Sequence, residues 1–166
     1  GGPARAVGGG GGAGARGVAR ATAGLRAGGR LIFVGAGTSG RLGILEAAEC
    51  PPTFGTDPRQ VQAAMAGGRG AVFHSREGAE DDRPAGAAEL SRRRVGPDDT
   101  VVGVAASGVT PYVRGALAEA RRRRAATVFV TCNPPSRRGA QPAEVVIAPI
   151  VGPEVLAGST RLKAAT

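Results

Sequence analysis

The sequence predicts an α/β fold with a parallel sheet, and three observations support that prediction. Continuous apolar runs, typical of strands buried on both faces, occur at residues 30–35, 100–106 and 126–132. Segments with the composition of helices lie between these runs. Apolar residues make up 42% of the 166 residues, which is enough for one domain with a hydrophobic core.

The first part of the chain is expected to contain a helix, a strand and a second helix. Residues 1–12 are glycine-rich and of low complexity, so we expect them to be disordered, and residues 13–27 form a weak helix. After the strand at 30–35, a helix with Ser39 near its N-terminus is expected to end at Pro51 and Pro52, because proline lacks the backbone N–H that a helix needs.

Local pattern leaves residues 59–68, "RQVQAAMAGG", ambiguous between strand and helix. The remaining elements follow from composition: a helix at 86–94, a strand at 100–106, a helix with Pro111 in its first turn, a strand at 126–132, a shorter strand at 143–150 and a last helix from 155.

Composition and charge narrow the classes of partner. The net charge of +9 raises the expectation of a polyanionic partner, but the arginines lie in separate clusters without aromatic residues to stack on bases. Lys163 is the only lysine, which indicates a compositional bias towards arginine. We therefore expect a solvated basic surface and no nucleic acid partner. No apolar run is long enough for a membrane span, and no signal peptide is recognised.

Cysteine and histidine are too few for most metal or nucleophile chemistry. Cys50 and Cys132 give no disulfide framework, and His74 is the only histidine, so neither a zinc site nor a histidine-based triad is expected. A reducing cytoplasm fits this composition best.

The first strand ends in a glycine-rich turn in which Gly35, Gly37 and Gly40 fit G-x-G-x-x-G. A dinucleotide site also needs an acidic residue at the end of the second strand, and Asp57 precedes the candidate strand. We therefore expect no nicotinamide or other cofactor. Thr38 and Ser39 indicate a terminal phosphoryl group instead, which suits hydroxyls and free backbone amides at a helix N-terminus.

Two further hydroxyl sets support the phosphate interpretation. Ser107, Gly108 and Thr110 follow the strand at 100–106, and Ser159 with Thr160 follows the last apolar segment. The alternative is that these serines and threonines only cap helices.

Four blocks carry a family resemblance. "GAGTSGRLGILEAAECPPTFGTDP", "AGG" with "EGAEDD", "VVGVAASGVTPYV" and "GPEVLAGSTRLKA" resemble N-acetylmuramic acid 6-phosphate etherases of the SIS (sugar isomerase) superfamily. A related, non-catalytic relative is the glucokinase regulatory protein. The resemblance implies a three-layer αβα sandwich with a mainly parallel central sheet, a strand within 59–68, and a homodimer with sites near the interface.

The resemblance also divides the chain. Residues 1–28 form a degenerate N-terminal segment, and residues 29–166 form a SIS-type sugar-phosphate-binding domain from which the C-terminal helical portion of the family is missing. The implied reaction converts N-acetylmuramic acid 6-phosphate and water to N-acetylglucosamine 6-phosphate and D-lactate in cell-wall recycling. The C1 aldehyde of the open-chain sugar acidifies the C2 proton, a base removes it, the lactate oxygen leaves C3, and water adds.

Glu49 and Glu80 match the two functional glutamates of the family, with Glu49 assigned to the leaving oxygen and Glu80 to the C2 proton. Glu77 is an alternative base in the same acidic cluster, and Glu154 either binds sugar hydroxyls or caps the last helix. Val109 stands where the family has arginine, which predicts weaker phosphate binding if that arginine supports the phosphate or the loop. A non-catalytic module that binds sugar phosphates therefore remains the alternative.

Overall fold

The computed structural model describes residues 11–134 and 141–152, and all five of their strands lie in one parallel sheet. The strand order is β2-β1-β3-β4-β5. The strands are β1 (Leu31–Gly35), β2 (Val61–Met65), β3 (Thr100–Val104), β4 (Ala126–Val130) and β5 (Val145–Ile147).

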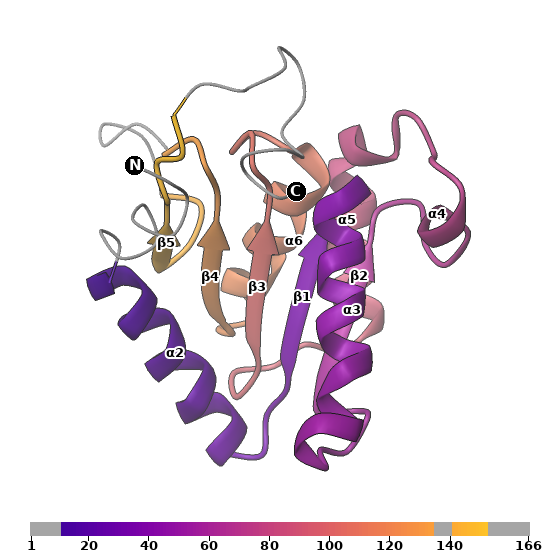
Figure 1. Cartoon of the computed structure of the whole chain (residues 1–166). Coiled ribbons are helices and arrows are strands. Elements are labelled where there is room, and N and C mark those ends of the chain that lie inside the picture. Colours follow the sequence, from indigo (N-terminus) through magenta and orange to yellow (C-terminus); the bar gives the residue numbers. More distant parts are fainter. Residues whose placement is uncertain (1–10, 135–140, 153–166) are drawn as a thin grey trace.

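Helices cover both faces of this sheet, so the molecule is the three-layer α/β sandwich that the sequence predicts (Figure 1). On one face lie α2 (Gly11–Arg26) and α3 (Gly37–Phe54), and on the other lie α5 (Arg83–Arg92) and α6 (Pro111–Arg122). The short α4 (Gly70–Phe73) and the single 3₁₀ turn η1 (Ala79–Asp81) lie between β2 and α5 along the chain.

The central strands are buried on both faces, as their continuous apolar sequences require. Val101 of β3 and Phe129 of β4 are fully buried, and so is Ile32 of β1. On the α6 side these side chains pack with Leu117. Because β1, β3 and β4 are neighbours in register, the core runs unbroken across the middle of the sheet.

Strand order fixes where a ligand site can form. The chain passes from β1 to β2 on one side of β1 and returns to β3 on the other, so the turns that leave β1 and β3 diverge towards opposite faces of the sheet. In open parallel sheets, ligands bind outside the carboxyl ends of the strands at such a switch point. The sequence placed its first two hydroxyl-bearing turns after these two strands.

The end of α3 differs from the sequence expectation, and the structure also resolves the ambiguous segment 59–68. The prediction that Pro51 and Pro52 end the second helix is wrong, because α3 includes both and continues to Phe54. Pro51 and Pro52 cannot donate to the carbonyls four residues before them, but the helix continues for one more turn, and Gly55 closes it in the left-handed conformation (φ 65°) by donating its N–H to Pro51 O. The ambiguous segment 59–68 contains β2, an edge strand paired with β1.

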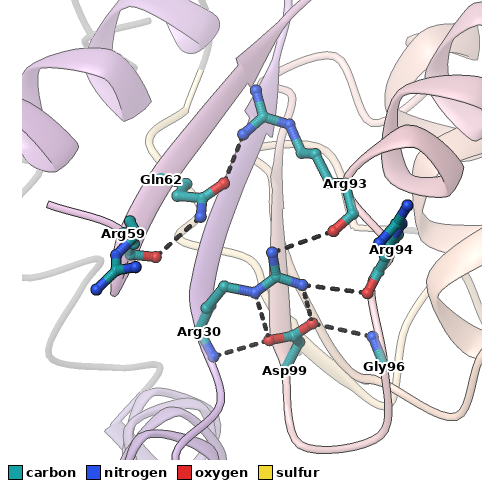
Figure 2. Close-up of polar contacts among 7 residues, drawn as sticks. All are labelled: Arg30, Arg59, Gln62, Arg93, Arg94, Gly96 and Asp99. Carbon is teal, nitrogen blue, oxygen red and sulfur yellow. Dashed lines mark hydrogen bonds and ion pairs between the residues drawn. The ribbon is translucent and has the colours of Figure 1, made fainter.

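An ion-pair network closes the opposite end of the sheet (Figure 2). The Asp99 carboxylate accepts hydrogen bonds from Arg30 N, Nε and Nη2 at 2.8, 3.0 and 2.6 Å and from Gly96 N at 2.9 Å. Arg30 also donates to the backbone oxygens of Arg93 and Arg94. These contacts tie the start of β1 to the turn before β3, far along the strands from the switch point. None of the helices described has the length and hydropathy to cross a bilayer.

Candidate active site

The turn after β1 depends on glycine for close packing. A Cβ on Gly35 would lie 2.6 Å from Gly40 N, and one on Gly40 would lie 2.7 Å from Met65 Cγ and 2.9 Å from Gly35 O. Gly37 meets no such contact but has φ 53°, a conformation that L side chains rarely adopt. The three glycines therefore let α3 begin directly against the ends of β1 and β2.

Neither helix at the switch point is capped by a side chain. Ala36 is the N-cap of α3 and Thr110 is the N-cap of α6, and neither makes a side-chain capping bond. The capping explanation for Thr110 therefore does not hold in this structure. Thr38 and Ser39 lie inside the first turn of α3 rather than at its cap. The first amides of α3 have no intrahelical acceptor and remain available to an anion, whereas α6 begins at Pro111, which has no N–H to offer.

A cavity of ≈ 410 Å³ lies between these turns and the segment that joins β2 to α5. It brings together four of the residues predicted from sequence, namely Gly37, Glu80, Ser107 and Thr110. Its volume is within the range of about 300–1,000 Å³ usual for small-molecule sites. Gly108 is buried next to Ser107 in the left-handed conformation (φ 77°), and a Cβ there would lie 2.7 Å from Asn133 O.

The cavity also contains two acidic and two basic side chains. Glu77 lines it beside Glu80, and Arg41 and Arg76 line it as well. Among the residues that the structure describes, none of these four charges forms an ion pair with another side chain. Two carboxylates and two guanidinium groups are thus presented to the same space, which suits general acid–base chemistry on an anionic substrate.

Glu49 lies elsewhere on the same chain. It is exposed near the C-terminal end of α3, twelve residues after Gly37, which corresponds to about 18 Å along a helix axis. The structure therefore does not bring Glu49 to the cavity of its own chain. Glu154, Ser159 and Thr160 lie outside the described residues.

The side chain that replaces the family's arginine also lies away from the cavity. Val109 is 65% exposed and lines a different hollow, together with Arg83, Arg114 and Arg121. Ser107 and Thr110, on either side of it, line the candidate site. The residue at position 109 is thus on the reverse side of the turn.

Sequence reasoning missed Arg41 and Arg76. Arg41 follows Gly37 by one helical turn, and side chains four residues apart share a helix face, so a signal for Arg41 was present. Arg76 lies between α4 and η1, in a connection whose path the sequence pattern did not reveal.

Comparison with known proteins fits this geometry. Residues 15–121 match the family described as the glucokinase regulatory protein N-terminal SIS domain, which is more than half of the chain. The chain belongs to this SIS family. Strands β1, β2 and β3 and the turns after β1 and β3 fall within the matched residues, whereas β4 and β5 follow them.

The chain is also similar to curated N-acetylmuramic acid 6-phosphate etherases. It is 63% identical over 142 residues to the protein of Symbiobacterium thermophilum, covering 86% of this chain and 47% of that one. It is 61% identical over 143 residues to the protein of Rubrobacter xylanophilus, covering 84% and 46%, and 54% identical over 149 residues to that of Klebsiella aerogenes, covering 90% and 49%. The chain therefore spans about half the length of the curated relatives it matches.

Proposed function

We propose that this chain is the sugar-phosphate-binding half of an N-acetylmuramic acid 6-phosphate etherase, a carbon–oxygen lyase that releases D-lactate. One observation carries the proposal: Glu80 lines the same cavity at the switch point as Gly37 of the first turn and Ser107 and Thr110 of the second. Thr38 and Ser39 follow Gly37 in the first turn of α3 but are not among the residues that line the cavity. The similarity to etherases named for this reaction supports it. The reaction belongs to amino-sugar recycling, and we place it in the cytoplasm, since both cysteines are free thiols.

The phosphoryl group binds at the two turns in this proposal. The uncapped amides of α3, with Gly37, Thr38 and Ser39, meet it from one side, and Ser107, Gly108 and Thr110 meet it from the other. Helix N-termini attract anions through their free N–H groups and partial positive charge, so no metal is needed to hold the phosphate. Ser159, Thr160 and Glu154 complete the expected set from the sequence alone.

The chemistry is an elimination followed by an addition. A carboxylate takes the C2 proton, which the C1 aldehyde makes acidic, and the C3–O bond breaks so that its electron pair leaves with the lactate oxygen. An acid protonates that oxygen. Water then adds its OH to C3 and a proton returns to C2, giving N-acetylglucosamine 6-phosphate and D-lactate. Glu80 is the proposed base, with Glu77 as its competitor in the same cavity.

Glu49 is the proposed acid, and it must then come from a second copy of the chain. Its face of α3 is unpartnered in a single chain, where Leu42 and Leu45 are 37% and 55% exposed. Positions 42, 45 and 49 follow i, i+3, i+7 spacing and share one side of the helix. A homodimer that buries this apolar stripe would place Glu49 at the interface, and its carboxylate would enter the partner's cavity.

The test is D-lactate release from N-acetylmuramic acid 6-phosphate by the wild type and by Glu80→Gln, Glu77→Gln and Glu49→Gln. We expect Glu80→Gln and Glu49→Gln to lose about 10²- to 10⁴-fold in kcat, the usual contribution of a general acid or base. Both variants should still bind N-acetylglucosamine 6-phosphate, because the phosphate turns are intact. Full turnover by Glu80→Gln together with a dead Glu77→Gln would transfer the base role to Glu77.

The second candidate is a non-catalytic module that senses sugar phosphates. The distance of Glu49 from the cavity in one chain favours it. Binding of the sugar phosphate without lactate release between pH 6 and pH 9 would support this function over the etherase.

A further inference from the structure

We propose that Arg41 is a positioning residue that holds the segment bearing Glu80 beside the phosphate turns. The catalytic role of this segment rests on the proposed function, whereas the hydrogen bonds of Arg41 are features of the structure. Arg41 Nε donates to Val72 O at 2.7 Å, and Arg41 Nη2 donates to Ala71 O at 2.8 Å. One guanidinium therefore joins the helix that begins at the phosphate turn to the helix that leads to the acidic cluster.

The two acceptors need such a donor. They belong to the last turn of α4, which has four residues and stops at Phe73. The last carbonyls of a helix lack an intrahelical partner, and a basic side chain can supply the missing hydrogen bonds. Ala71 is buried and lines the candidate cavity together with Arg41, so the bond lies at the wall of the site.

The segment beyond α4 has few other anchors. Residues 74–78 are all exposed. Arg76 Nη1 donates to Gly67 O at 3.1 Å, and at the far end Asp82 caps α5 by accepting from Ala85 N at 2.8 Å. Ala79, next to Glu80, packs against the hydrophobic core and holds the far end of the segment. Arg41 ties its start to α3, so we expect the path between these two anchors, which bears Glu77 and leads to Glu80, to depend on Arg41.

Arg114 performs the matching task on the other turn. Its Nε and Nη2 donate to Gly108 O at 3.1 and 2.8 Å, and its guanidinium lies 5.8 Å from the centre of the Phe129 ring. Arg114 therefore supports the turn that carries Ser107 and Thr110. Each arginine thus supports a different part of the site. Arg41 positions the segment that bears the carboxylates, and Arg114 positions the phosphate turn.

The test compares Arg41→Lys and Arg41→Gln with Arg114→Gln. Lysine keeps the charge but cannot place two N–H groups in the fixed fork of a guanidinium. We expect both Arg41 variants to lose about 10- to 100-fold in kcat, since misplacement of a reacting group by about 1 Å can cost that much. Their affinity for N-acetylglucosamine 6-phosphate should change by less than about threefold, whereas Arg114→Gln should weaken that affinity more than it lowers kcat.

Amide hydrogen exchange of residues 74–82 gives a readout that does not depend on turnover. We expect faster exchange there in both Arg41 variants and unchanged exchange in Arg69→Gln, which removes a neighbouring exposed arginine that lines another cavity. Unchanged exchange at 74–82, or an equal loss of product binding and kcat, would overturn the positioning role. If the wild type releases no lactate, the proposed function fails, and the exchange result still decides the inference.

Discussion

At the residue scale, Asp99 shows how a buried charge is stabilised. Its side chain is 7% exposed, and burial alone would raise the pKa of the carboxyl group. Hydrogen bonds from the Arg30 side chain and from the backbone N–H groups of Gly96 and Arg30 outweigh that cost and hold the pKa of Asp99 below its ordinary value (Figure 2).

Asp99→Asn should therefore destabilise the fold at neutral pH. We expect the free energy of unfolding at pH 7 to fall by about 1–3 kcal/mol, because Arg30 loses its counter-charge while it stays partly buried. A lowered folded pKa gives stability that is present above the unfolded value of about 3.9 and is lost as pH falls through the folded pKa. Urea unfolding at pH 7 and pH 3 should therefore show a smaller difference in the variant than in the wild type.

The matched control for Asp99 is the exposed pair of Arg59 with Asp57. Its side chains are 87% and 48% exposed. Asp57→Asn should leave the urea midpoint at pH 7 nearly unchanged, because solvent screens exposed pairs. An equal loss of unfolding free energy in Asp99→Asn and Asp57→Asn would mean that the buried network stabilises the fold no more than the exposed pair does.

At the element scale, the sequence predicted the interior strands of the sheet, whose two faces are covered by helices (Figure 1). The runs at 30–35, 100–106 and 126–132 become β1, β3 and β4, the three strands that have a neighbouring strand on each side. β2 was undecidable from local pattern, because Gln62 and three small or flexible apolar residues favour no period. Pairing with β1, a non-local contact, makes it a strand.

Gly40→Ala tests the close packing of α3 on the sheet. The added methyl would meet Met65 Cγ at 2.7 Å and Gly35 O at 2.9 Å, so we expect a loss of about 1–3 kcal/mol from overpacking and weaker sugar-phosphate binding as the N-terminus of α3 moves. Gly14→Ala, in α2, meets nothing within 4 Å and should be neutral or stabilising by up to about 1 kcal/mol. Calorimetry and titration with N-acetylglucosamine 6-phosphate measure both effects, and an unchanged Gly40→Ala would contradict this packing argument.

At the scale of the whole molecule, sequence reasoning found the parts of the site that follow from topology. Ser107 and Thr110 meet Gly37 because the carboxyl ends of parallel strands share one edge, and this rule needs no side-chain detail. Arg41 and Arg76 were missed because their contacts depend on the path of the connection from β2 to α5. The separation of Glu49 from the cavity follows from its place twelve residues after Gly37 on the same helix. It was missed because both glutamates were assigned through the family resemblance, which does not say that one subunit supplies both.

In the proposed homodimer, a complete site needs Glu80 from one chain and Glu49 from the other. Glu49 and Glu80 lie at different ends of one subunit, and a two-fold axis would give each cavity one glutamate from each chain. A chain with Glu49→Gln still offers Glu80, and a chain with Glu80→Gln still offers Glu49. Mixed dimers would therefore contain one intact site.

The most direct measurement is D-lactate release by an equal mixture of Glu49→Gln and Glu80→Gln proteins, unfolded and refolded together so that subunits exchange. If two subunits share each site, each variant alone is inactive and the mixture recovers about a quarter of the wild-type rate, since half of the dimers are mixed and each has one intact site. A mixture as inactive as its components, although mixed dimers form, would contradict a site shared between two copies of this chain.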